Sequence, residues 1–92
     1  MGDRVLKNYM EILVLNQIDE ALAQYIDICK CQYCRCDIVA LALNLLPPRY
    51  ITSEKGELLL KVASTTVQTR SDVLAALTQA IIRVSNNPKH DY

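Results

Sequence analysis

All four cysteines of the chain lie within eight residues. They are Cys29, Cys31, Cys34 and Cys36. Four thiolates match the tetrahedral coordination of a structural zinc ion, and Cys31-x-x-Cys34 has the spacing of a zinc knuckle. We therefore predict one structural zinc ion per chain, held by all four cysteines and leaving no open position for a reactive water. The site would carry two net negative charges, which Lys30, Arg35 and backbone N–H groups are placed to offset.

Three other uses of the cysteines remain open. They could be ordinary buried residues, although Lys30, Gln32 and Arg35 between them make a poor core segment. They could form disulfides, although the short ring sizes and an expected cytosolic setting argue against this. They could hold an iron–sulfur cluster, which also takes four thiolates but usually at wider spacing.

Arg70 is the cation that the pattern singles out. It lies in an otherwise apolar heptad line between Ala63 and Leu77, so a continuous helix would half-bury its guanidinium. A buried guanidinium needs a partner, because leaving it unpaired is costly. That partner could be a carboxylate, such as Asp37 or Glu11, or a phosphate, which arginine binds with two hydrogen bonds.

Arg49 and Tyr50 present the same choice after the second predicted helix. Arg49 can bond the exposed carbonyls of that helix end, or it can meet an anion while Tyr50 stacks on a base. If the chain binds a small anionic ligand, we expect Arg35, Arg49, Tyr50 and Arg70 to converge on it. The reason is that the cysteine segment and the Pro-Pro turn bracket one central helix. We assign no function to His90, which lies alone in the tail.

Helical periodicity supplies the elements that must position these residues. A first helix is predicted from Asp3, as its N-cap, to about Ile26. A second, nearly all-apolar helix is predicted over Ile38–Leu46, with Asp37 as its N-cap. Pro47-Pro48 ends it, because proline lacks the N–H and disfavours helix in the residue before it.

The C-terminal half holds apolar heptad positions from Leu59 to Val84. Two interpretations are open: one continuous helix, or a break near residues 69–72 with Thr69 or Ser71 as a new N-cap. Asn86-Asn87-Pro88 ends the last helix. Nothing alternates over a strand's length, so the predicted fold class is all-α: a small compact helical domain with a zinc-binding cysteine loop between the first and second helices.

Length and composition limit the function classes. The 92 residues predict a single domain, 1–92, with 51% hydrophobic residues and no Phe or Trp, hence an aliphatic core. Ten acidic and ten basic residues cancel, whereas a nucleic-acid-binding domain would be basic. No apolar run approaches the ~20 residues of a membrane span, and no secretory signal is visible. We expect a cytoplasmic protein that binds neither nucleic acid nor membranes.

The stretch from Cys29 through Cys-Arg-Cys-Asp to Leu-Pro-Pro-Arg-Tyr50 resembles the late competence development protein family ComFB. The resemblance continues in Asn8-Tyr-Met-Glu11 and Gln68-Thr-Arg-Ser-Asp-Val73, so it covers nearly the whole chain. It implies a small helical cytoplasmic dimer with zinc on its four cysteines. Some relatives, notably in cyanobacteria, resemble receptors for cyclic dinucleotides.

The sequence contains no recognisable catalytic motif, since there is no Ser/His/Asp set and no Gly-rich phosphate loop. We expect no enzyme, but a regulatory module that binds an unknown protein partner or a small anionic ligand such as a cyclic dinucleotide. A purely structural protein is the second class. The segment Ile12–Leu15, which is apolar on every side, and the heptad lines of the last helix together predict a homodimer, because they offer more apolar surface than so short a chain can cover. The alternative is that the central helix Ile38–Leu46 covers both within one chain.

Overall fold

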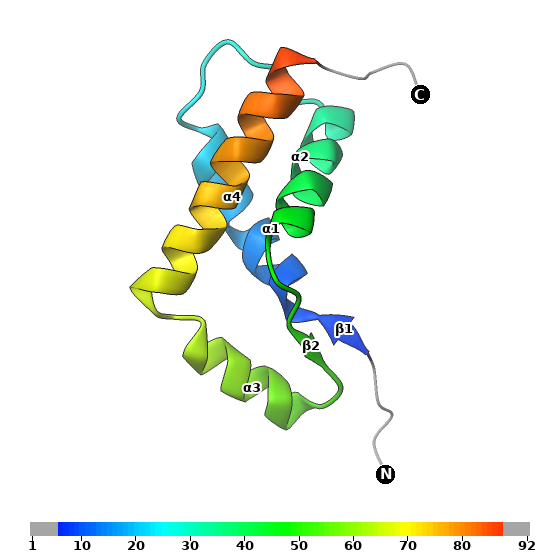
Figure 1. The fold of residues 1–92 in the computed structure, drawn as a ribbon, viewed down its shortest axis with the longest axis vertical. Coiled ribbons are helices and arrows are strands. Elements are labelled where there is room, and N and C mark those ends of the chain that lie inside the picture. The colour runs from blue at the N-terminus through cyan, green and yellow to red at the C-terminus, as the bar shows by residue number, and fades with distance from the viewer. Residues whose placement is uncertain (1–5, 88–92) are drawn as a thin grey trace.

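Three helices form a bundle in the computed structural model, which describes residues 6–87, and a fourth helix lies to one side (Figure 1). In chain order the elements are β1 (Lys7–Asn8), α1 (Tyr9–Leu22), α2 (Gln32–Leu45), β2 (Tyr50–Ile51), α3 (Glu54–Ala63) and α4 (Val67–Asn86). The predicted all-α class is confirmed. The sequence did not predict the two-residue antiparallel ladder, in which Lys7 pairs with Ile51 and Asn8 with Tyr50. Within the described part, no helix is long and apolar enough to cross a membrane.

Helix α1 begins at Tyr9, later than predicted, because the residues before it are extended in β1. Asn8 is its N-cap: the side-chain Oδ1 accepts a hydrogen bond from the backbone N–H of Met10 at 3.1 Å. The predicted cap, Asp3, lies outside the described residues. The helix ends at Leu22 rather than near Ile26, which is 90% exposed and makes no contribution to the core.

Helix α2 begins six residues before the predicted start. Cys31 is its N-cap, so the prediction of Asp37 in that role is wrong. The Cys31 sulphur accepts a hydrogen bond from the N–H of Cys34 at 3.5 Å, which lets the helix include half of the cysteine segment. At the other end, Leu45 is the last helical residue, just before the Pro47-Pro48 stop.

The C-terminal half consists of two helices, so the interpretation with a break is confirmed. The break lies at residues 64–66, earlier than the predicted 69–72, and Thr66 is the N-cap. Its hydroxyl accepts a hydrogen bond from the N–H of Thr69 at 3.2 Å. Thr65 donates its hydroxyl proton to the carbonyl oxygen of Val62 at 2.8 Å. These local bonds compete with a continuous helix, which explains where it breaks.

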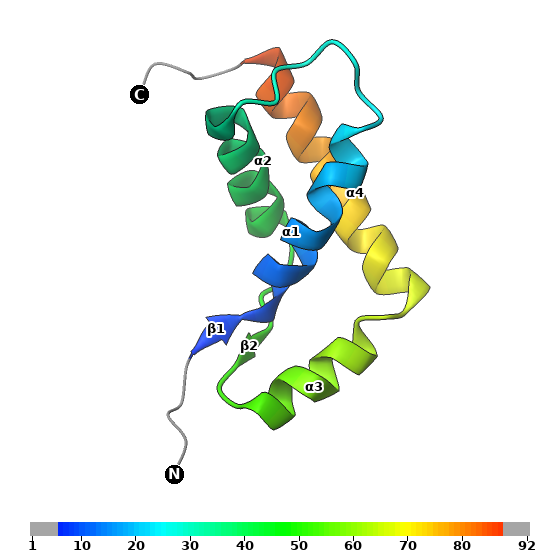
Figure 2. The ribbon, with the colours of Figure 1, turned by 180° about the vertical axis from the view of Figure 1, so that it is seen from behind.

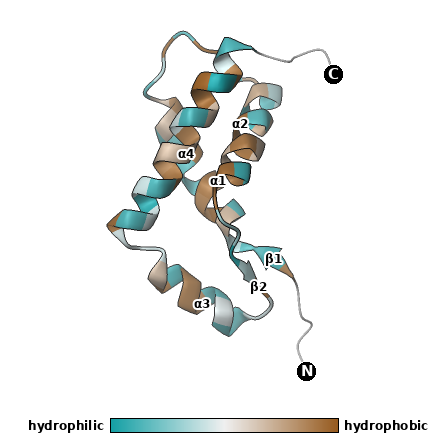
Figure 3. Ribbon diagram, viewed as in Figure 1, coloured by the Kyte–Doolittle hydropathy of each residue, from teal (hydrophilic) through white to brown (hydrophobic). Residues whose placement is uncertain are grey.

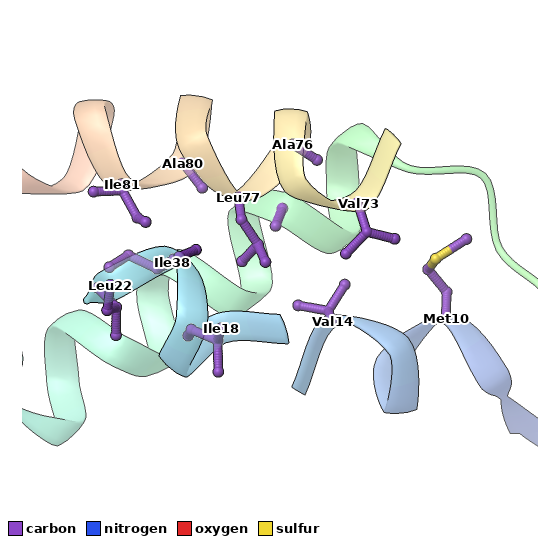
Figure 4. Packing of buried hydrophobic residues seen from close by; sticks show 12 residues of the cluster. Met10, Val14, Ile18, Leu22, Ile38, Val73, Ala76, Leu77, Ala80 and Ile81 are labelled. Atoms are coloured by element: carbon purple, nitrogen blue, oxygen red, sulfur yellow. The ribbon is translucent and has the colours of Figure 1, made fainter. Parts of the chain in front are cut away.

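The core lies between α1, α2 and α4 and is aliphatic apart from Met10, as predicted (Figure 4). Val14, Ile18, Leu77 and Ile81 are fully buried in it. The small side chains of Ala76 and Ala80 on α4 and Ala42 on α2 are also buried and let the helices approach closely. Figure 3 shows hydrophobic segments along α1, α2 and α4.

The cysteine segment and α3 lie at opposite ends of the long axis of the molecule (Figures 1 and 2). That axis measures 48 Å. Helix packing is dominated by α2 on α4 and α1 on α4, and α3 has only a minor part in it. The two ends are therefore separate surfaces with separate chemistry.

Candidate metal centre

Three of the four cysteines come together where the loop after α1 meets the start of α2. The sulphurs of Cys29, Cys31 and Cys34 all lie within 4.8 Å of one another. Cys29 and Cys31 precede the helix, and Cys34 lies in its first turn. Cys34 is 1% exposed, whereas Cys29 is exposed and Cys31 is half-buried. The group is thus anchored in the core on one side and open to solvent on the other.

Cys36 is not part of this group. It follows Cys34 by two residues in the same helix, a rotation of about 200° around the helix axis. Its side chain is exposed. The structure therefore assembles three of the four sulphurs that the sequence predicts as ligands. The reason is that α2 begins at Gln32 instead of after the cysteine segment.

The local backbone determines which thiol ionises first. The backbone N–H of Cys34, aided by hydrogen bonds from Cys29 and Tyr33, lowers the pKa of Cys31 from 9.0 to about 7. Burial, reinforced by the neighbouring cysteines, raises the pKa of Cys34 to about 12. Without a cation, Cys31 is therefore a stronger acid than Cys34. A metal cation would favour deprotonation of both, because it binds the deprotonated form of each ligand.

The three sulphurs fit a zinc ion. Zinc–sulphur bonds of about 2.3 Å in a tetrahedron place the sulphurs roughly 3.8 Å apart. The observed 4.8 Å limit on the sulphur separations is compatible with this value after a small inward shift. A soft thiolate donor set selects zinc over magnesium or calcium.

Arg35, predicted to offset the thiolates or to bind a ligand, forms an ion pair with Asp19 of α1. The bond from Arg35, a charge-assisted hydrogen bond, lowers the pKa of the Asp19 carboxyl. Sequence reasoning missed Asp19, although a signal was present. Asp19 carries a negative charge in the last turn of α1, where the helix dipole disfavours it, so a cationic partner was to be expected.

Arg49 has structural partners at the other end of α2. Its backbone N–H donates to Oδ1 of Asn8 at 2.7 Å, and its carbonyl accepts from the N–H of Tyr9 at the same distance. Its guanidinium donates to the hydroxyl of Ser64, the C-cap of α3, at 3.4 Å. Arg49 thus bonds the end of α3, not that of α2. Tyr50 lies next to it in β2 and is 62% exposed.

Arg70 lies in the first turn of α4 and is exposed, so the expected half-burial is wrong. Ala63, its predicted heptad neighbour, belongs to α3, and the break between the helices interrupts the apolar line. Neither Asp37 nor Glu11 forms an ion pair with Arg70 within residues 6–87. Arg70 instead borders a depression of about 220 Å³ between α1 and α4, whose other lining residues are Gln17, Glu20, Val67, Ser71 and Leu74.

The four predicted ligand residues do not form one site within a chain. Arg35 is near the start of α2 and Arg49 and Tyr50 follow its end, so the 14-residue helix separates them by about 20 Å. Arg70 is on a different helix. Residues that bracket one helix lie at opposite ends of it, and the expected convergence fails for this reason.

The family described as late competence development protein ComFB matches residues 7–88. Competence protein ComFB of Bacillus subtilis (strain 168) is 31% identical over 84 residues, which are 91% of this chain and 86% of that protein. The solved structure of the late competence protein ComFB from Bacillus subtilis matches with a TM-score of 0.80 at 30% identity. This match covers 94% of this chain and 97% of the other.

Proposed function

The chain belongs to the late competence development protein ComFB family, and we propose that it is a non-catalytic, homodimeric regulatory adaptor stabilised by one zinc ion. The observation that carries the proposal is the convergence of three cysteine sulphurs at the start of α2. A thiolate-bound zinc ion stabilises the fold instead of performing chemistry when its coordination is filled by the protein. Cys36 is the nearest further thiol in the sequence to complete that coordination.

The zinc would join the loop after α1 to the first turn of α2. The loop from Ala23 to Lys30 carries Cys29 and has no fully buried residue, although Tyr25 and Ile28 pack against the core. Cys34, in contrast, is buried in the first turn of α2. A metal bonded to both ends of this turn would hold the loop against the helix. Its binding free energy would then be part of the folding free energy.

Metal analysis of the purified chain tests the zinc proposal. We expect one zinc ion per chain by elemental analysis and native mass spectrometry, and a lower Tm after chelation. Protein that contains no metal when purified without chelators, and whose melting is unchanged by added zinc, would contradict it. Iron in place of zinc would support the iron–sulfur alternative.

An adaptor acts through its surfaces, and several large apolar side chains of this chain are exposed. Leu6, Leu15, Ile26, Val62 and Val67 are all more than half exposed. Apolar patches on small proteins mark interaction surfaces. A second copy of the chain would cover part of this surface, and a protein partner another part. Sedimentation at micromolar concentration tests the homodimer, because a monomeric mass contradicts it.

The second candidate function is reception of a cyclic dinucleotide. It is favoured by the exposed Arg70 and Ser71 beside the depression between α1 and α4, although Glu20 in the same lining opposes an anion. Calorimetry with cyclic di-GMP and cyclic di-AMP tests it on the wild type, on Arg70→Ala and on Arg83→Ala as an exposed control in the same helix. Saturable binding lost only in Arg70→Ala would support the receptor, and no heat with either nucleotide would eliminate it.

A further inference from the structure

Helix α3 has no buried residue, although it is ten residues long. Its contact with the rest of the chain is one-sided: Gly56, Leu60 and Ser64 are half-buried or buried. At Gly56 an added Cβ would be in ordinary van der Waals contact with Ile51 of β2, at 3.8 Å. An isolated helix of this length is marginal in water, so α3 depends on what packs against it.

The opposite side of α3 is an apolar stripe made of Leu58, Leu59 and Val62. Their exposed fractions are 61%, 63% and 65%. Spacings of three and four residues place Leu58 and Leu59 next to Val62 on the helix surface. Leu59 and Val62 lie on the free side of α3 together with the exposed Lys55, whereas Leu58 also borders a groove towards α1. Figure 3 shows hydrophobic segments along α3. Nothing within the described residues covers it.

The charged residues beside the stripe differ in sign between the two ends of α3. Glu54, Glu57 and Lys61 form one flank of α3, and this flank borders a groove of about 520 Å³ whose other lining residues are Tyr9, Ile12, Asn16 and Leu58. Glu57 pairs with Lys7. Glu54 at the N-terminal end and Lys61 at the C-terminal end form no ion pair within residues 6–87.

We propose that the α3 stripe is the seam of the homodimer, and that it packs antiparallel on the α3 stripe of a second copy. This inference rests on the homodimer of the proposed function and names its surface. In a two-fold interface each patch meets itself. For two helices packed face to face and antiparallel, the axis brings the same flanks together with their ends exchanged.

That exchange makes the flank complementary to itself. Glu54 meets the partner's Lys61, and Lys61 meets the partner's Glu54, whereas a parallel two-fold pair would place this flank against the other flank of the partner helix and form neither pair. The groove along this flank leaves room for the lysine side chain of the partner. The chain also carries no net charge, so two copies do not repel each other as a whole. This pattern favours a second copy over an unrelated partner.

The α3 stripe alone is too small for a stable dimer interface, so the surface beside it must also be buried. A ten-residue helix is about 15 Å long, and alone it offers less than the ~800 Å² per partner of a standard interface. The groove beside α3 extends the face on one side.

Sedimentation equilibrium of the full chain and three variants tests the seam. The double variant Leu59→Lys/Val62→Lys should be a folded monomer, since both side chains are exposed within one chain. Ile82→Lys is the matched control, because Ile82 is an exposed apolar residue of α4 at 48% exposure, and it should remain a dimer. Far-UV circular dichroism confirms that each variant is folded. A dimer that survives the double variant overturns the seam but leaves the homodimer, whereas a monomeric wild type overturns both.

Charge reversal tests the antiparallel arrangement without disturbing the apolar stripe. Lys61→Glu should raise the dimer dissociation constant roughly ten-fold, because two symmetric pairs become repulsive. Glu54→Lys/Lys61→Glu should restore it, since the pairs re-form with their signs exchanged. Positions 54 and 61 are two helical turns apart, about 10 Å, so they cannot rescue each other within one helix. Equal dissociation constants for the single and double reversal variants would overturn the antiparallel seam.

Discussion

The guanidinium of Arg35 forms an ion pair with the carboxylate of Asp19, which joins the start of α2 to the last turns of α1. Each charge is unfavourable in its own helix. A cation near a helix N-terminus and an anion near a C-terminus both oppose the helix dipole. Together they neutralise each other beside the cysteine cluster. Arg35 therefore contributes to helix packing before it contributes to any thiolate or phosphate.

The Asp19–Arg35 pair predicts a specific dependence of stability on pH. Arg35 lowers the pKa of Asp19 below its usual 3.8, so the pair stabilises the fold above the unfolded pKa. This stabilisation is lost as the pH falls through the folded pKa. The Tm of the wild type should exceed that of Asp19→Asn near pH 6, and the two should converge as the pH falls from about 5 to about 2.

The control for this prediction is Glu20→Gln, which alters an exposed neighbour that has no ion pair within residues 6–87. The difference between wild type and Asp19→Asn should be small and should shrink at high salt, because the pair is solvent-exposed. A difference that grows towards acid pH would contradict the assigned pair.

Asn8 is expected to contribute strongly to the stability of the fold, although it lies in a two-residue strand near the N-terminus. Its Oδ1 accepts two backbone hydrogen bonds, from Met10 in α1 and from Arg49 after α2. Asn8→Ala should lower the free energy of unfolding by about 1–2 kcal/mol, since it removes an N-cap and leaves a second donor unpaired. Asn8→Asp keeps the acceptor and should cost less. Chemical denaturation with equal losses in both variants would contradict this role.

The sequence predicted the helical class, the aliphatic core and the Pro47-Pro48 stop because periodicity and proline chemistry are local properties. The sequence did not predict the start of α2, because a cysteine sulphur caps this helix in place of the usual oxygen. The sequence also did not predict that Arg70 is exposed. A heptad phase that continues through a break looks the same for one helix as for two, and only the packing of α4 alone against the bundle exposes Arg70.

The core prediction concerns Leu77, which is fully buried between α4 and the other two bundle helices. Leu77→Ala should cost about 2–5 kcal/mol of unfolding free energy, because the well-packed site leaves a cavity. Ile82→Ala, on the exposed side of the same helix, should cost much less, of the order of 0.5 kcal/mol. Urea denaturation monitored by circular dichroism measures both. Equal costs would mean that α4 faces the bundle differently.

The cysteine cluster predicts that the four cysteines are not equivalent. Cys34 is buried within the group of three sulphurs, whereas Cys36 is exposed and outside it. Cys34→Ser should abolish zinc retention and leave an unfolded or insoluble chain. Structural zinc supplies on the order of 10 kcal/mol, which is comparable with the entire stability of a small domain. Cys36→Ser should retain more zinc and a cooperative melting transition. Zinc content and Tm of both variants, measured side by side, decide the matter: equal loss in both would mean that metal binding unwinds the first turn of α2 to bring Cys36 into the site.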